Sequence, residues 1–358
     1  MIDNGANARV AETNGVNGHS QTNGTNGHVV PVAQKVNGEV KADGTAMDGE
    51  VLAQQHLEPL WLKMDAMVPP TPNPVAAPHI WKYQETLPYL LEAGRVVPAE
   101  AAERRVLMLV NPKMGKYPKS PYTTDSIYGG LQLVNPGETA PAHRHIAFAI
   151  RFIIDGEGFT AVEGKKIPLK RGDVIVTPTW HWHDHGNESD KPVIWLDALN
   201  LPLFRFARVH IAEGYEESRY PSTLSTPCEW SHPWEHVEAS LLAQEGPHTI
   251  HHYTTKGDQP LSTTLGVQAE RIEAGHITQE SRDVASFLVH CYTGDGLTIV
   301  EPPNGPKKVI EWTTRDTFVI PAYSKVTHVN KGTEPAYLVL VHDKPLLKNL
   351  GLNKPDFV

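Results

Sequence analysis

Histidines cluster in two short blocks of this sequence. The first block holds His143 and His145, and the second holds His181, His183 and His185. In a β-strand, residues two apart point to the same face, so His143 and His145 can both reach into a barrel. A third imidazole from a neighbouring strand would complete a metal site and leave positions open for catalysis. The alternative interpretation is a His-x-His pair on a solvated strand edge.

The segments around both blocks have a β pattern. Beyond residue 106, short apolar runs alternate with turn signals such as Asn135-Pro-Gly137 and Glu163-Gly164. The turns recur roughly every 8 to 12 residues, a spacing that predicts a sandwich or barrel rather than βαβ units. Strands of this kind would position the histidines.

The pattern occurs twice in the chain. The stretch Val289–Gly296 echoes Arg151–Gly158, with the two-glycine turn in step, and Arg315–Pro321 echoes Gly172–Pro178. A recurring unit of this kind predicts an internal duplication that forms two similar β-domains. We expect a first domain at residues 106–205 and a second at residues 245–358, joined by a polar linker at residues 206–244.

The N-terminal part differs in composition. Residues 1–50 hold six Asn-Gly pairs and cannot bury enough apolar surface to offset the entropy of ordering, which predicts a disordered tail. Residues 51–105 contain Pro-rich punctuation and then helix-forming sequence, which predicts a helical arm. Within that arm, Trp81–Leu91 predicts one or two short helices that end at Gly94.

Charge and cysteine content limit the possible partners. The 358-residue chain has a formal net charge of −9 and a pI near 6.1. Nucleic acid or an anionic membrane surface would require a basic patch, so the acidic balance argues against both. No apolar run approaches the roughly 18 residues of a membrane-spanning helix. With two cysteines and no secretion-signal pattern, we expect a cytoplasmic globular protein.

The histidine blocks resemble the two halves of the cupin signature, in which glycine precedes His-x-His and a second glycine precedes proline and then His-x3-Asn. The matching positions are Gly137, His143, His145, Gly172, Pro178, His183 and Asn187. The spacing to the asparagine selects His183 as the third ligand over His181 and His185. Many cupins add a glutamate where this chain has Ala149 and Ile150. Three neutral imidazoles without a carboxylate suit a borderline divalent metal.

A longer stretch resembles the gentisate 1,2-dioxygenase family. It comprises residues 143–158, Trp180–Asn187 and Trp195–Asp197, with further likeness upstream at Glu103–Leu107. That family, with its salicylate and 1-hydroxy-2-naphthoate relatives, consists of bicupin Fe(II) ring-cleavage enzymes. The resemblance implies an all-β bicupin of two jelly-roll barrels, here with a helical arm and a disordered tail. It also implies Fe(II) as the cofactor and a homo-oligomer, commonly a tetramer.

The resemblance assigns the metal ligands and the groups that bind a carboxylate. His143, His145 and His183 would hold Fe(II). Arg151 lies an even number of residues after His145, on the same strand face, and its fork suits the carboxylate of a substrate. A structural ion pair is the alternative role for Arg151. Arg104 matches a second carboxylate contact, although in a helix-like stretch it could equally be solvated.

The resemblance also assigns the surroundings of the metal. Gln132 matches an amide of the substrate pocket, and Tyr128 occupies a position where some relatives have tryptophan. His185 would hydrogen-bond substrate or oxygen and act as an acid or base, and Asp197 would orient such a histidine. His181 has no assigned role.

The second repeat lacks these histidines. Alignment of the two repeats places Ser281, Asp283 and Val326 at the three ligand positions and His328 at the position of His185. We therefore expect one metal per chain, in the first domain.

These assignments predict a ring-cleaving dioxygenase. Its substrates would be dioxygen and a small hydroxylated aromatic carboxylic acid, and gentisate would give maleylpyruvate. The main alternative is another cupin metalloenzyme, either a non-oxidative decarboxylase or a tailoring enzyme that acts on a different aromatic acid. A non-catalytic storage or binding bicupin is a third possibility, but such a protein would have no use for Arg151 and Asp197 beside a complete ligand set.

Overall fold

The computed structural model describes residues 49–102, 105–115 and 119–352. The chain divides into two compact units, residues 1–64 and 65–358. Described residues of the first unit form a helix, a 3-10 helix and the start of a short helix: α1 (Gly49–Gln54), η1 (Leu60–Leu62) and α2 (Met64–Met67). Residues 1–48 of the predicted disordered tail lie outside the described residues.

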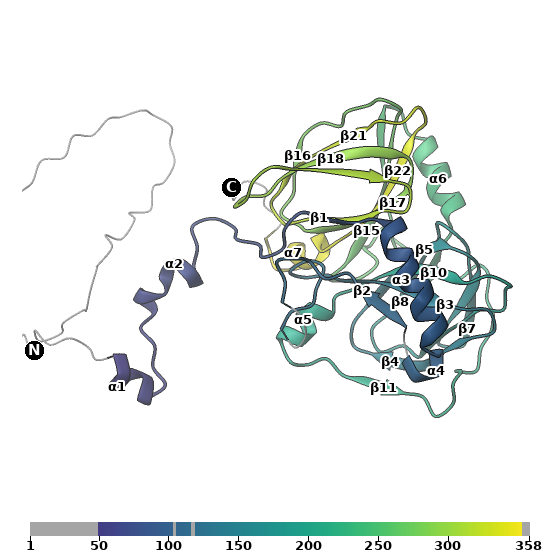
Figure 1. Ribbon diagram of the computed structural model, residues 1–358, viewed down its shortest axis with the longest axis horizontal. Coiled ribbons are helices and arrows are strands. Elements are labelled where there is room, and N and C mark those ends of the chain that lie inside the picture. The colour runs from purple at the N-terminus through teal and green to yellow at the C-terminus, as the bar shows by residue number, and fades with distance from the viewer. Residues whose placement is uncertain (1–48, 103–104, 116–118, 353–358) are drawn as a thin grey trace, which may run out of the picture. The chain divides into compact units, whose positions relative to one another are not determined.

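In the second unit a strand and two helices precede a first β-barrel (Figure 1). Two six-stranded sheets make this barrel, in the strand orders β13-β8-β5-β10-β3-β2 and β11-β4-β9-β6-β7-β12. Its strands are β2 (Val106–Met108), β3 (Tyr128–Val134), β4 (Thr139–His145), β5 (Ala149–Asp155), β6 (Gly158–Val162), β7 (Lys165–Leu169), β8 (Val174–Thr177), β9 (His183–Gly186), β10 (Val193–Leu199), β11 (Ala212–Gly214), β12 (Thr223–Leu224) and β13 (Ser231–His232).

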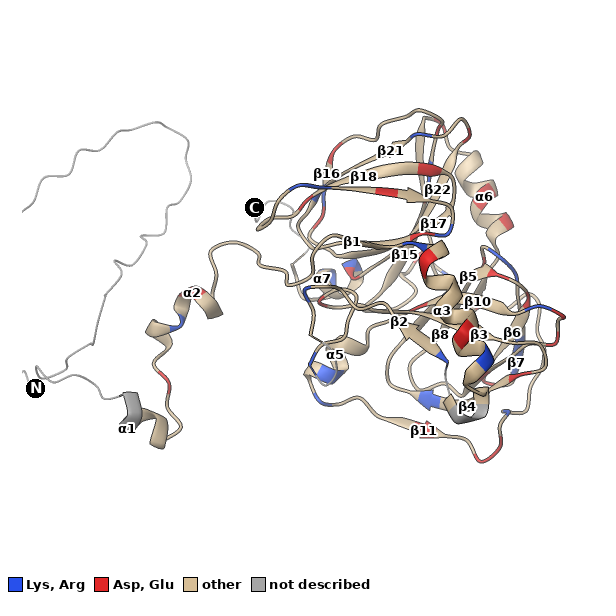
Figure 2. Cartoon of the chain, in the orientation of Figure 1, with Lys and Arg blue, Asp and Glu red and all other residues tan. Residues whose placement is uncertain are grey.

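A second barrel follows, made of a six-stranded sheet β1-β20-β17-β22-β15-β14 and a four-stranded sheet β16-β21-β18-β19. Its strands are β1 (His79–Trp81), β14 (His248–His252), β15 (Gly266–Ile272), β16 (Ser281–Arg282), β17 (Phe287–Thr293), β18 (Asp295–Glu301), β19 (Lys308–Thr313), β20 (Thr317–Ile320), β21 (Lys325–Asn330) and β22 (Ala336–His342). The remaining helices are α3 (Tyr83–Val96), α4 (Ala99–Ala102), α5 (Leu201–Phe206), α6 (Trp234–Leu242) and α7 (Lys344–Asn349). Among the described residues, no helix combines the length and apolarity needed to cross a membrane. Figure 2 shows acidic and basic residues on both barrels.

The two barrels exchange their outermost strands. Strand β1 precedes the first barrel in the chain, yet it pairs with β20 of the second barrel, and the following helix α3 packs on β3 of the first. Strand β13 pairs with β8 of the first barrel, and the following helix α6 packs on β14 and β15 of the second. The duplicated unit therefore includes a strand and a helix before each barrel, taken from the predicted arm and the predicted linker.

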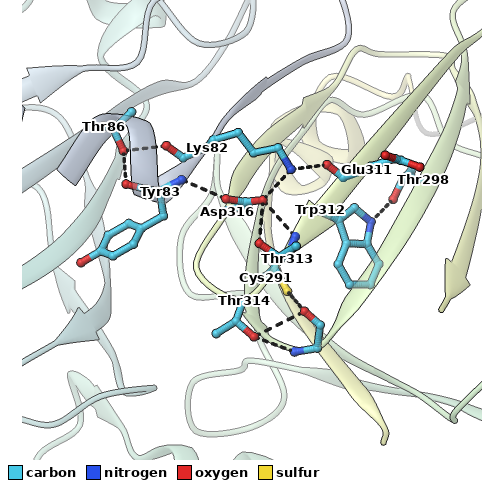
Figure 3. Close-up of polar contacts among 11 residues, drawn as sticks. Lys82, Tyr83, Thr86, Cys291, Thr298, Glu311, Trp312, Thr313, Thr314 and Asp316 are labelled. Atoms are coloured by element: carbon cyan, nitrogen blue, oxygen red, sulfur yellow. Dashed lines mark hydrogen bonds and ion pairs between the residues drawn. The ribbon is translucent and has the colours of Figure 1, made fainter. Parts of the chain in front are cut away.

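Equivalent aspartates fix the starts of these two helices. Asp316 accepts hydrogen bonds from the backbone N–H of Tyr83 and from Lys82 Nζ, both at 2.9 Å (Figure 3). Asp173 accepts one from the backbone N–H of Trp234 at 3.0 Å. Each barrel thus binds the first backbone donors of the helix that packs on the other barrel, which satisfies groups that a helix N-terminus leaves unpaired.

Helix α3 does not end at Gly94, contrary to the sequence-based prediction, and continues to Val96. A Cβ at Gly94 would lie 3.0 Å from Leu133 Cδ2 of strand β3. Glycine here allows close approach of helix to sheet, and this packing outweighs its weak helix propensity. The main hydrophobic core contains residues of both barrels, including Leu133 and Ile150 of the first and Val339 of the second, together with Trp234 of α6.

Candidate metal centre and active site

Three buried histidines converge inside the first barrel. His143 on β4 pairs with His183 on β9, and His145 lies two residues further along β4. Their exposed fractions are 6%, 5% and 0%, and one nitrogen from each lies within 4.8 Å of the others. The alternation of β4 and its register with β9 therefore form a group able to hold a metal ion, from the residues that the sequence predicted.

Backbone carbonyls orient all three rings. Each Nδ1 lies within hydrogen-bond distance of a carbonyl oxygen close in sequence: Pro141 at 2.7 Å for His143, Ala147 at 2.8 Å for His145 and His181 at 2.8 Å for His183. Because a carbonyl oxygen can only accept, Nδ1 carries the proton and Nε2 presents its lone pair to a metal. The Nε2 atom of His183 is buried and has no hydrogen-bond partner among the described residues. The site therefore fits a divalent metal.

Burial keeps the third ligand in the form that binds metal. Desolvation, together with the neighbouring His143 and His145, lowers the pKa of His183 well below its ordinary value. A neutral imidazole is the form that ligates a cation, whereas an imidazolium would repel it.

Arg151 on β5 lies opposite Asp197 on β10 in the same barrel. Arg151 Nε is 3.2 Å from Asp197 Oδ1, and Arg151 Nη1 donates to Thr177 Oγ1 at 2.6 Å. Both charged side chains are almost fully buried. Asp197 thus holds the guanidinium of Arg151. The role of Asp197 in orienting a histidine stays a prediction, and so does the role of Arg151 in binding a carboxylate.

His185 lies beside the three converging histidines, on the strand that carries His183. Its ring centroid is 5.7 Å from that of His183 and 5.2 Å from the ring of Trp195. Its Nδ1 contacts the hydroxyl oxygen of Thr160 at 2.9 Å. This contact fixes the orientation of the ring and therefore the direction of Nε2.

Two predicted substrate contacts lie on β3. Gln132 is 3% exposed and pairs with Trp195 of β10, and its Nε2 is buried without a hydrogen-bond partner among the described residues. An amide donor left in this way is expected where a ligand completes the network. Tyr128 begins the same strand. Arg104 lies outside the described residues.

The segment after α5 crosses the strand that carries two of the histidines. Strand β11 pairs with β4, with Ala212 opposite His145, and the His210 ring centroid is 6.2 Å from that of His145. Arg144, between the two histidines of β4, forms an ion pair with Glu213 of β11. Its guanidinium also stacks on the rings of Trp180 and Trp182, at 4.6 and 4.4 Å.

Sequence reasoning missed Thr160, Thr177 and His210. The threonines are set by cross-strand register, which no local spacing reveals, and His210 lies in the predicted linker, where nothing suggested an approach to the metal site. His181, which had no assigned role, packs its ring against Trp230 at 5.7 Å.

Comparison with known proteins identifies the family. A cupin-domain family model matches residues 130–199. The chain is 33% identical over 346 residues to a gentisate 1,2-dioxygenase of Ralstonia sp., covering 84% of this chain and 91% of that protein. It is 32% identical over 332 residues to gentisate 1,2 dioxygenase 1 of Aquipseudomonas alcaligenes, covering 84% and 92%. This chain belongs to the gentisate 1,2-dioxygenase family.

The fold agrees with that membership. The crystal structure of a salicylate 1,2-dioxygenase from Pseudaminobacter salicylatoxidans superposes with a TM-score of 0.77 at 24% identity, covering 85% of this chain and 95% of that one. The predicted all-β bicupin fold and the predicted family are therefore confirmed. The protein is a ring-cleaving dioxygenase, and its three-histidine group indicates a metal cofactor.

Proposed function

We propose that this enzyme uses Fe(II) and dioxygen to cleave the ring of gentisate or a closely related hydroxylated aromatic carboxylic acid. The supporting observation is the set of three carbonyl-oriented imidazoles, found in a chain whose relatives are named gentisate 1,2-dioxygenases. Its relatives also include a 1-hydroxy-2-naphthoate 1,2-dioxygenase of Nocardioides at 27% identity, so ring size is the main open variable in the substrate.

His143, His145 and His183 would hold the iron. Three neutral donors leave the ion its full double positive charge and leave positions for further ligands. When bound, Fe(II) supplies the one-electron chemistry that allows dioxygen to react with an aromatic ring.

Arg151 would bind the substrate carboxylate. The pair with Asp197 and the hydrogen bond to Thr177 hold the guanidinium in one orientation, so it needs no reorganisation when the anion arrives. Gln132 would donate its Nε2 hydrogens to a substrate oxygen, and this would satisfy a buried donor. Arg104 would provide a second carboxylate contact, and Tyr128 would shape the ring pocket.

His185 would transfer protons during ring opening. Its contact with Thr160 fixes the imidazole, and its burial among the converging histidines keeps bulk water away from the transferred proton.

We also expect a homo-oligomer, which light scattering of the full chain would measure.

Oxygen uptake tests the proposal. The chain is loaded with Fe(II) without air and offered gentisate, salicylate and 1-hydroxy-2-naphthoate in turn, while absorbance reports the ring-opened product. We expect one dioxygen consumed per substrate cleaved, no uptake by zinc-loaded protein, and no iron binding by His183→Ala. Full iron occupancy in His183→Ala would contradict the ligand set. Occupied iron without oxygen uptake on any of the three acids would contradict the proposed substrate class.

A further inference from the structure

The second barrel contains a cavity of about 290 Å³ between its two sheets, on the side of β14, β15, β16 and β21. Its inner wall is apolar and includes Phe287, Ile320 and Leu340, all buried or nearly so. Polar groups converge on it from several strands. A small pocket with apolar walls and a few fixed polar groups is the usual form of a ligand site.

A buried carboxylate lies at the inner end of this cavity. Glu270 is 4% exposed, and its two oxygens contact His248 Nε2 at 2.8 Å and Gln268 Nε2 at 2.7 Å. Burial alone would raise the pKa of Glu270, but the hydrogen bond from His248, the neighbouring His328 and the hydrogen bond from Gln268 together lower it to about 2. The cavity therefore offers a fixed, ionised acceptor to a ligand hydroxyl.

A histidine lines the same cavity as that acceptor. Trp312 Nε1 donates to Thr298 Oγ1 at 2.9 Å, as Figure 3 shows, and Thr298 Oγ1 lies 2.8 Å from His328 Nδ1. Indole nitrogen can only donate, so Thr298 Oγ1 accepts from Trp312, and its second contact holds the His328 ring in one orientation. His328 lines the cavity and brings an imidazole nitrogen that can hydrogen-bond a ligand hydroxyl.

These groups occupy the positions of active-site groups in the first barrel. Glu270 pairs with Leu338 on β22 as Gln132 pairs with Trp195 on β10. The Thr298–His328 contact repeats that of Thr160 and His185. The polar lining is thus repeated.

The ligand positions are not repeated. Ser281 lies opposite Val326 where the first barrel has His143 opposite His183. This register is the one expected from aligning the two repeats, and serine and valine cannot replace two imidazoles as metal ligands. The second cavity therefore keeps polar groups equivalent to those around the first site, but it lacks the histidines that could bind a metal.

The outer lining of the cavity carries both signs of charge, because Glu280 and Asp283 line it together with Arg282 and Lys344. Arg282 is half-buried at the rim, and Lys344 reaches it from α7, where its Nζ lies 2.9 Å from Asp283 Oδ2 and 3.3 Å from Gln268 Oε1. Both cations line the cavity, and the fork of an arginine can bind a carboxylate in two places.

We propose that the second barrel binds a small hydroxylated aromatic carboxylic acid as a non-catalytic ligand. The hydroxyl would bind Glu270 and His328, the ring would pack between the apolar walls, and the carboxylate would face Arg282 and Lys344. The identity of this ligand class with the substrate class rests on the proposed function, whereas the existence of the site does not.

Fluorine NMR with 5-fluorosalicylate tests the proposal on the full Fe(II)-loaded chain without air. A ligand beside the paramagnetic iron gives a broadened signal, whereas one in the second barrel gives a sharp signal. We expect both, with two molecules bound per chain by equilibrium dialysis. Glu270→Gln and Arg282→Ala should each weaken the sharp-signal site by at least about tenfold, because each removes a charged hydrogen-bond partner.

Glu311→Gln is the matched control, since Glu311 is exposed on β19 of the same barrel. It should leave both signals unchanged, and 3-fluorobenzoate, which lacks the hydroxyl, should bind the second site at least about tenfold more weakly. A single bound molecule per chain that gives only the broadened signal, or a sharp signal that survives both cavity variants, would overturn the proposal. Loss of the broadened signal alone, together with no oxygen uptake, would count against the proposed function and not against this site.

Discussion

The buried pair of Arg151 and Asp197 allows a quantitative test of how the first barrel is built. The two charges are 3.2 Å apart, and their side chains are only 4% and 6% exposed. At an effective dielectric constant of about 20 their attraction is roughly 5 kcal/mol. Removing either partner leaves the other charge buried and uncompensated, so Arg151→Val or Asp197→Leu should lower the free energy of unfolding by about 3–5 kcal/mol.

The second barrel supplies the template for a compensated double variant. At the equivalent register it places Val289 opposite Leu340, and both are buried in an apolar cluster. Apolar replacement of a whole buried pair is often neutral. The double variant Arg151→Val with Asp197→Leu should therefore lie within about 1–2 kcal/mol of the parent, with a coupling free energy of at least about 2 kcal/mol.

Urea unfolding followed by circular dichroism measures these differences. All four proteins are compared after metal removal with a chelator, because bound metal would add its own stabilisation. Val289→Ala, an equivalent position without a charge partner, is the control and should lose only about 1–2 kcal/mol. After reloading with Fe(II), the double variant should keep its iron and lose activity through weaker binding of substrate.

Two outcomes would refute this reasoning. Single variants within about 0.5 kcal/mol of the parent would mean that the pair is solvated rather than buried. A double variant less stable than either single variant would mean that an apolar pair cannot take the place of the ion pair in the first barrel.

Three further predictions follow from other contacts. Gln132→Ala should raise KM for the acid by about tenfold with kcat less affected, and steady-state oxygen uptake measures both. Asp316→Ala should lower the unfolding free energy by about 1–3 kcal/mol by uncapping α3, unlike exposed Asp65→Ala, in urea unfolding. Burial lowers the pKa of His232 to about 4. The neutral imidazole that the fold requires is present above about pH 6.5, and the stability it contributes declines as the pH falls toward 4. His232→Phe should therefore reduce the loss of unfolding free energy between pH 6.5 and 5 by up to about 2 kcal/mol in thermal unfolding, whereas exposed His236→Phe should not.

The convergence of the three histidines could be predicted from sequence because its geometry is local. The alternation of a strand puts His143 and His145 on one face, and the spacing within the cupin signature selected His183. The alignment of the repeats was also predictable, because tight turns with glycine recur in step. The register of Ser281 with Val326 matches that alignment.

Contacts made across the barrel could not be predicted in the same way. Thr177 and Thr160 contact Arg151 and His185 because of how strands pair, and nothing in their own sequence neighbourhood marks them. The approach of His210 to His145 depends on a strand of only three residues, β11. The error at Gly94 has the same origin, since tertiary packing on β3 overrode the local signal.

The exchange of strands gives the second barrel a structural role that needs no metal ligands. Strand β1 completes the sheet of the second barrel, and β13 completes that of the first. Asp316 and Asp173 bind the starts of helices α3 and α6, and the main core takes residues from both barrels. The sheet around the metal therefore depends on the second barrel for packing and for a helix start. In the second barrel the apolar pair Val289 and Leu340 stands at the register of the buried ion pair of Arg151 and Asp197, and an apolar pair of this kind can replace an ion pair at little cost in stability.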